Sequence, residues 1–143
     1  MTAVLDRYMQ EVLKPAWELL ESNLAPTAAM RLYAEGLMVR EDAPPGCLMA
    51  EMMINGDQLG PGTHALLREH MKEHVRRFEK WVQRWQEQGM VIDEVPPPIA
   101  ARHIASLLVS LALQAHRGGR PERLRQHLSL SLRCYFEEPL YPY

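Results

Sequence analysis

Cysteine is scarce in this chain of 143 residues, which contains only Cys47 and Cys134. Two cysteines are too few for the disulfide framework that holds small secreted domains together. Long apolar runs are also missing: Ile104–Ala115, the most apolar one, is shorter than the roughly 20 residues that a membrane-spanning helix needs. No cationic leader precedes an apolar stretch at the N-terminus, where Asp6 and Arg7 come early. We therefore expect a soluble, cytoplasmic protein without a membrane partner.

An excess of charge of one sign is absent as well. The 16 Lys and Arg residues nearly balance the 18 Asp and Glu residues, which leaves a net charge of −2. A free-standing nucleic-acid binder normally carries a clustered basic excess, so we expect no nucleic acid to bind this chain alone. With 47% hydrophobic and 24% charged residues the composition is that of a globular protein, and the length fits one domain over residues 1–143.

The signatures of common enzyme sites are missing too. The sequence contains no nucleophile elbow, no glycine loop that would cradle a phosphate and no constellation of paired carboxylates. We therefore assign no catalytic residue, no cofactor and no metal.

Strand-like alternation is also absent, and helical periodicity takes its place. Pro15 lies within the first helical segment and predicts a kink or a local break there. The sequence predicts an all-α single domain of about six helices. They are expected at Thr2–Ser22, from near Pro26 to a stop at Glu41–Gly46, and at Cys47–Ile54, Thr63–Gln88, Ile99–His116 and Pro121–Glu137.

The last two expected helices are unusually apolar. Ile99–Ala115 is apolar almost all round, and the final segment repeats Ser-Leu at residues 129–132. An apolar face that one domain cannot cover usually marks an interface, so we expect a two-fold homodimer in which these helices form a four-helix bundle. The side chains expected at this interface are Ile104, Leu108, Leu111, Ala115, Leu124, Leu128, Ser131, Leu132 and Tyr135.

Methionine and aromatic side chains are concentrated on faces that should converge among the second to fifth helices. Flexible, polarizable methionines suit a site for a small apolar ligand, although ordinary core packing explains the same pattern. His103, Ser110 and Gln114 share a face with Leu107 and would supply polar groups either to this pocket or across the dimer. The expected ligand-binding residues are Met30, Tyr33, Met49, Met52, Met53, Met71, His74, Phe78, Trp81, His103, Leu107, Ser110 and Gln114.

Two histidines and one cysteine allow more than one interpretation. His74 lies in the apolar stripe of the longest helix, as either a core histidine with a hydrogen-bond partner or a ligand contact. His70, Glu73 and His74 also match the H-x-x-E-H pattern of zinc-dependent hydrolases, but no third metal ligand is identified. Cys47 follows Gly46 at a helix start and is either a small buried residue or a reactive thiol.

The order of the segments resembles the C-terminal regulatory domain of TetR-type transcriptional regulators. The matching stretches cover nearly the whole chain. They are AVLDRY (3–8), PPGCLMAEMM (44–53), HMKEHVRRFEKWVQRWQEQGMV (70–91) and IAARHIASLLVSLALQAHRGGRPERL (99–124).

This resemblance implies a homodimeric domain that binds a small apolar or amphipathic effector and thereby controls DNA binding in the intact protein. In that family a helix-turn-helix head reads the DNA. The head would precede Ala3, so the resemblance implies the regulatory module without its head. The ligand would enter between the first, third and fourth helices. Two alternatives remain: a zinc-dependent hydrolase that uses residues 70–74, and a headless dimer that titrates a full-length paralogue.

Overall fold

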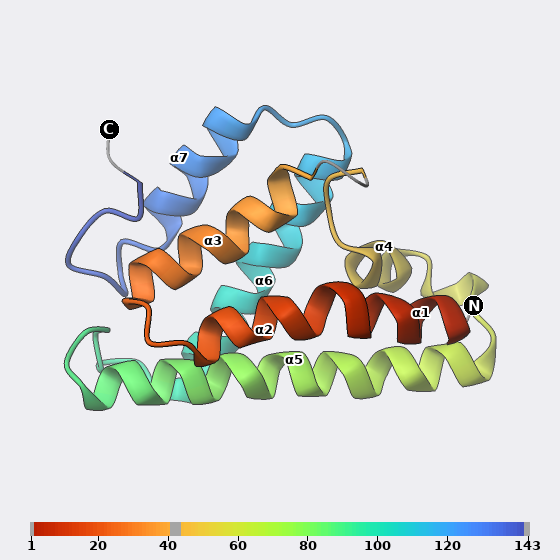
Figure 1. The fold of residues 1–143 in the computed structure, drawn as a ribbon, viewed down its shortest axis with the longest axis horizontal. Coiled ribbons are helices and arrows are strands. Elements are labelled where there is room, and N and C mark those ends of the chain that lie inside the picture. The colour runs from red at the N-terminus through yellow and green to blue at the C-terminus, as the bar shows by residue number, and fades with distance from the viewer. Residues whose placement is uncertain (1, 41–43, 142–143) are drawn as a thin grey trace.

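The computed structural model describes residues 2–40 and 44–141, and every regular element within them is helical (Figure 1). The all-α class is therefore confirmed. The elements are α1 (Thr2–Tyr8), the π-helical turn η1 (Met9–Leu13), α2 (Lys14–Glu21), α3 (Pro26–Met38), α4 (Leu48–Ile54), the 3₁₀ turn η2 (Gly56–Gln58), α5 (Pro61–Glu87), α6 (Pro97–His116) and α7 (Pro121–Ser131).

Proline sets the start of four of these helices. α3, α5, α6 and α7 each begin with a proline in the first turn, where its missing N–H would have had no intrahelical partner anyway. For this reason α5 begins before the expected Thr63 and α6 before the expected Ile99. Gly89 has φ of 71° and follows the end of α5, as expected for a left-handed cap. Of the expected stop at Glu41–Gly46, residues 41–43 lie outside the described residues.

The expected last helix, Pro121–Glu137, is too long, because α7 ends at Ser131. After α7 the chain turns so that the carbonyl of Tyr135 accepts a hydrogen bond of 3.0 Å from the Ile92 amide. The ring of Phe136 then packs edge-on against Trp81, with 6.3 Å between ring centroids. A continued helix would carry the Tyr135 carbonyl and the Phe136 ring away from these contacts.

The first helix does not break at Pro15. α1, η1 and α2 follow one another directly, and the expected distortion takes the form of a π-helical turn just before the proline. Pro15 has no N–H, and its ring would collide with the carbonyl of Glu11 in a regular α-helix. The backbone widens instead, and the Lys14 amide bonds to the carbonyl of Met9, five residues back.

The C-terminal half of the first helix is fastened along α5. The two helices run side by side in the same direction (Figure 1). Arg77 forms an ion pair with Glu21, and the Arg84 guanidinium donates to the carbonyls of Leu20 at 2.6 Å and Ser22 at 3.2 Å. Because these carbonyls belong to the end of α2, Arg84 caps that end and ties it to α5.

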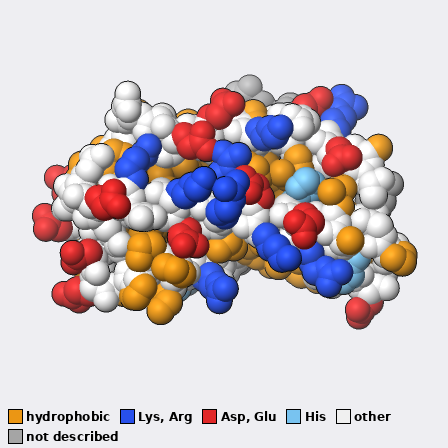
Figure 2. All heavy atoms as spheres, turned by 90° about the horizontal axis from the view of Figure 1, so that it is seen from below, with side chains coloured by type: hydrophobic (Ala, Val, Ile, Leu, Met, Phe, Trp, Pro, Cys, Tyr) orange, Lys and Arg blue, Asp and Glu red, His pale blue; other side chains and the backbone are white. Residues whose placement is uncertain are grey.

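The outward face of α5 is charged, as its polar stripe predicts. In Figure 2, which views the molecule from the α5 side, Lys and Arg side chains gather in the middle of this face with Asp and Glu among them. Several pair within the helix; Glu73, for example, accepts hydrogen bonds from both Arg76 and Arg77. Basic and acidic groups therefore interleave here.

α6 lies at the centre of the molecule and packs against α3, α5 and α7. The residues expected at a dimer interface are largely inside this single chain, so that assignment is wrong for all of them except Ser131, which is half-buried. A second copy cannot reach the others in the folded protomer. Those that are at most 5% exposed are Ile104, Leu108, Leu111, Ala115, Leu124, Leu128, Leu132 and Tyr135.

By length and composition alone α6, with 20 residues, is apolar enough to cross a membrane. The expectation that this region is too short for a span considered only the most apolar run, Ile104–Ala115, which is shorter than the whole helix. The core helix of a soluble protein passes the same test, and the inward face of α6 is buried against its neighbours. This property of α6 is therefore weak support for a membrane span.

Candidate functional site

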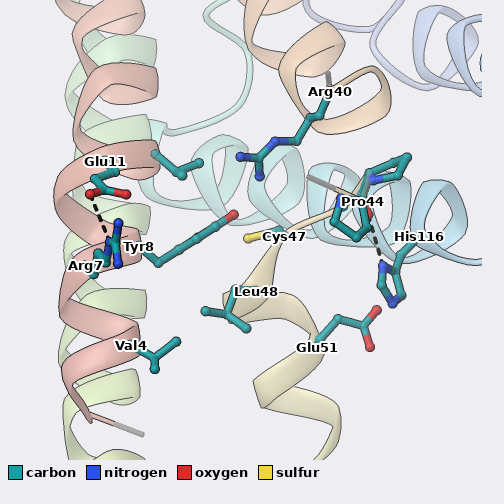
Figure 3. A pocket seen from close by; sticks show the side chains of 13 residues that line it. Val4, Arg7, Tyr8, Glu11, Arg40, Pro44, Cys47, Leu48, Glu51 and His116 are labelled. Atoms are coloured by element: carbon teal, nitrogen blue, oxygen red, sulfur yellow. Dashed lines mark hydrogen bonds and ion pairs between the residues drawn. The ribbon is translucent and has the colours of Figure 1, made fainter. Parts of the chain in front are cut away.

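A pocket of about 480 Å³ opens between the first half of the first helix and the segment that leads into α4 (Figure 3). The first helix supplies one wall from α1 and η1, and α4 with the residues before it supplies the other. His116 at the end of α6 completes the lining. The lining residues are Val4, Arg7, Tyr8, Glu11, Val12, Arg40, Pro44, Pro45, Gly46, Cys47, Leu48, Glu51 and His116.

The wall before α4 is held tightly against α6. Gly46 has φ of 115°, and a Cβ added to it would come within 3.0 Å of both the Ala112 carbonyl oxygen and the His116 Cβ. Only glycine allows the chain to approach α6 this closely. The Nδ1–H of His116 donates to the Pro45 carbonyl at 3.0 Å, which fixes the same wall to the end of α6.

The pocket carries both charges and apolar surface. Arg7 and Glu11, one helical turn apart in the first helix, neutralise each other in an ion pair of 3.0 Å. Arg40 also has an interaction of its own. Glu51 is half-buried, and its Oε1 atom is buried without a hydrogen-bond partner among the described residues. Glu51 is thus the lining carboxylate that the described chain leaves uncompensated.

The Tyr8 side chain extends from the first helix into the pocket, and its hydroxyl lies next to the Cys47 thiol (Figure 3). The Tyr8 hydroxyl is buried and has no hydrogen-bond partner in the described part of the chain. Burial raises the pKa of Tyr8 well above its ordinary value, and the neighbouring Cys47 thiol raises it further. Tyr8 is therefore a neutral phenol that can donate to a ligand or accept from one.

The methionine and aromatic residues expected to line a ligand site do not line this pocket. Most of them form the solid core, where Tyr33, His74, Phe78 and Trp81 pack as a chain of rings. Tyr33 and Trp81 border separate cavities of about 110 and 120 Å³. Met30, Tyr33, Met49, Met52, His74, Phe78 and Trp81 are at most 6% exposed; Met71 is half-buried against the core, and Met53 is 45% exposed.

The expected polar end of the ligand site is also elsewhere. His103, Ser110 and Gln114 share one face of α6 with Leu107, as expected, but that face points away from the core. The three polar residues are exposed and Leu107 is half-buried. None of these four residues lines the pocket, and the alternative role of the polar ones across a dimer stays a prediction.

His74 is a core histidine with a partner. Its Nδ1 accepts a hydrogen bond of 3.0 Å from the Trp17 indole N–H, and its ring packs on Phe78. The side chain is 6% exposed, and this burial lowers its pKa to about 4. His74 is therefore neutral at physiological pH and helps to join the first helix to α5.

We expect this histidine to make the fold sensitive to acid. A base whose pKa is lower in the folded state than in the unfolded state binds fewer protons when folded. Stability should therefore fall as the pH drops from 6.5 toward about 4, by about 3 kcal/mol in total, and His74 should add nothing above 6.5. Urea unfolding across this pH range measures the slope.

His74→Gln should flatten the slope, because the amide oxygen can still accept from Trp17 but does not titrate in this range. His64→Gln, which changes an exposed histidine of the same helix, is the matched control and should keep it. An unchanged slope in His74→Gln would show that other groups cause the acid sensitivity.

The H-x-x-E-H pattern does not form a metal site in this structure. His74 is bound to Trp17, Glu73 is bound to Arg76 and Arg77, and the Nε2 atom of His70 lies 3.8 Å from Asp6. The described residues contain no group of three or more His, Cys, Asp or Glu side chains that could hold a metal ion. The zinc-hydrolase alternative has no geometric support.

Sequence reasoning missed most of the residues that line the pocket. Of the thirteen lining residues, only Cys47 stands out in the sequence as a possible functional side chain. Its position directly after Gly46 was the available signal, because a glycine at a turn before a helix often marks a close approach of the backbone. Tyr8 and Glu51 belong to different helices, and no local pattern connects them.

No protein-family model matches this chain, and neither a curated protein nor a solved structure matches it.

Proposed function

We propose that this chain is the effector-binding and dimerisation domain of a TetR-like transcriptional regulator of the cytoplasm. The observation that carries the proposal is the pocket of about 480 Å³ between the first helix and α4. Its volume lies in the range of about 300–1,000 Å³ that is common for small-molecule sites. Apolar walls with a few polar groups suit a small amphipathic ligand. The resemblance of the segments supplies the regulator part of the proposal.

The position of the pocket offers a route from ligand to helix movement. α2 is fastened to α5 by Arg77 and Arg84, whereas α1 and η1 form a wall of the pocket. A ligand there shifts α1 only if it binds one placement of the helix more tightly than another. In an intact regulator, the placement of α1 would set the distance between two DNA-reading heads. Those heads must match half-sites about 34–36 Å apart.

A homodimer would use the outward faces of the last two helices. Ile99 on α6 is 60% exposed and Leu130 on α7 is 64% exposed. Leu107 lies half-buried on the same outward face of α6, beside the small side chains Ser106 and Ser110. Small residues allow close helix packing, so two copies can pair here without disturbing the core of either.

The pocket also separates this proposal from a partner-titrating dimer. A dimer that acts only by trapping another chain needs no cavity for a ligand. The pocket, lined by a buried tyrosine hydroxyl and an uncompensated carboxylate, favours ligand binding.

Thermal unfolding in the presence of small amphipathic compounds tests the proposal. A ligand at one hundred times its Kd should stabilise the fold by about 2.7 kcal/mol, a shift of several degrees for a chain of this size. Val4→Trp should abolish the shift, because Val4 is exposed at the pocket and the indole would fill it.

Val39→Trp is the matched control, since Val39 is equally exposed and does not line the pocket. It should keep the shift. An equal shift in both variants would place the ligand elsewhere. No stabilisation of the wild type by any compound would contradict the proposal and favour the titrating dimer.

A further inference from the structure

Glu51 differs from the other charged side chains of the pocket. Arg7 and Glu11 neutralise each other, and Arg40 has an interaction of its own. In the described chain Glu51 takes part in no ion pair, and its buried Oε1 atom accepts no hydrogen bond. A buried carboxylate oxygen without a donor costs free energy, so a donor supplied by a ligand would recover that cost.

The surroundings of Glu51 favour positive charge. Glu51 and His116 lie across the pocket from Val4 and Tyr8 of the first helix (Figure 3). His116 is the last residue of α6, so the negative end of that helix dipole lies on the same side of the pocket, although the carbonyls of Leu113, Gln114 and Ala115 there accept backbone hydrogen bonds. The helix end and the carboxylate thus both favour a cation there.

The opposite side of the pocket, formed by the first helix, offers apolar surface beside the Arg7–Glu11 pair. Val4 and Val12 line it, and the Tyr8 ring extends from it into the pocket, while Leu48 adds an apolar side chain from the α4 side. An apolar body fits against these side chains while a polar head reaches Glu51. The terminal torsion of a glutamate is soft, so either carboxylate oxygen can turn toward the head.

We infer that the pocket takes a cationic amphiphile, an aliphatic amine whose ammonium group binds Glu51 and whose apolar body lies against the first helix. This inference rests on the ligand-binding function proposed above and narrows its ligand class. The ammonium N–H groups donate to the carboxylate in a salt bridge in which both partners are charged, whereas the hydroxyl of an alcohol donates from a neutral group.

Three probes of equal chain length test the inference on the full chain by calorimetry near neutral pH: octylamine, 1-octanol and octanoate. Octylamine should bind at least about tenfold more tightly than octanol, and octanoate should bind most weakly. Added salt should weaken the binding of octylamine and leave that of octanol unchanged.

Glu51→Gln keeps the shape of the side chain and removes its charge. It should lower the affinity for octylamine at least about tenfold and leave the affinity for octanol unchanged. Glu18→Gln, at an exposed position of α2 outside the pocket, is the matched control and should change neither.

The two ways of failing are distinct. If octanol binds but octylamine binds no better, or if Glu51→Gln leaves the preference intact, the inference is overturned and ligand binding stands. If none of the three probes binds, the inference is overturned, and the proposed function is decided separately by the thermal-unfolding test with other amphipathic compounds.

Discussion

Leu111→Arg is expected to unfold the protomer. Leu111 is 2% exposed in the C-terminal half of α6, which packs against α3, α5 and α7. The substitution removes a buried side chain worth about 2–5 kcal/mol and places an unpaired charge there at a cost of several kcal/mol more. This sum approaches the whole stability of a typical domain, about 5–15 kcal/mol. Circular dichroism should show loss of helix and of the cooperative thermal transition.

Leu130→Arg is the matched control on the surface, because Leu130 is 64% exposed on α7. It should change the stability by no more than about 0.5 kcal/mol. If the outward faces of α6 and α7 pair two copies, Leu130→Arg should also convert a dimer into a folded monomer in sedimentation. A folded Leu111→Arg monomer would contradict the core position of Leu111, and a Leu130→Arg dimer would place the interface elsewhere.

Phe78→Ala is expected to destabilise the fold by about 3–5 kcal/mol without changing ligand preference. Phe78 is fully buried and packs edge-on between Tyr33 and Trp81, with ring centroids 5.4 and 6.4 Å away. Its removal leaves a cavity in the centre of the aromatic core, but the pocket near Glu51 keeps its lining. Urea unfolding measures the first effect and calorimetry with octylamine the second.

Gln83→Ala, at an exposed position of the same helix, controls for the loss of side-chain bulk in α5 and should be close to neutral. A loss of stability under about 1 kcal/mol in Phe78→Ala would mean that the ring is not tightly packed. A changed order of ligand affinities would mean that the core and the pocket communicate.

The sequence predicts the faces of α6 correctly but not their directions. The 3.6-residue period groups Ile104, Leu108 and Leu111 on one face and His103 with Leu107 on another, and the structure keeps both groups. We expected the first group at a dimer interface and the second at the ligand. Instead, the first group is buried within the protomer because it belongs to the more apolar face, and the second group faces outward and lines no part of the pocket.

The helices themselves are predictable because their signals are local. Prolines start four of them, glycines follow the ends of α5 and α6, and apolar periods fill them, so the errors lie at helix termini and the largest is the C-terminus of α7. The pocket, in contrast, is formed by three segments that are far apart in the sequence. Tyr8, Glu51 and His116 come together only when α1, α4 and α6 have packed, so no local pattern predicts it. A methionine-rich helix face predicts that the face is buried, but it does not say whether it meets a ligand or other side chains. Most of these methionines pack against other side chains in the core.

The π-helical turn before Pro15 determines which side chains of α1 reach the interior. Leu5, Met9, Leu13 and Trp17 are spaced four residues apart, and all four are buried. In an ideal α-helix each residue advances about 100°, so three such steps would rotate Trp17 about 120° away from Leu5. The wider turn at Met9–Leu13 takes up part of this drift. Removing one residue from this turn would rotate Leu5 by about 100° about the helix axis, toward water, while Trp17 stayed in place. The single extra residue of the turn therefore sets the rotation of α1 relative to α2.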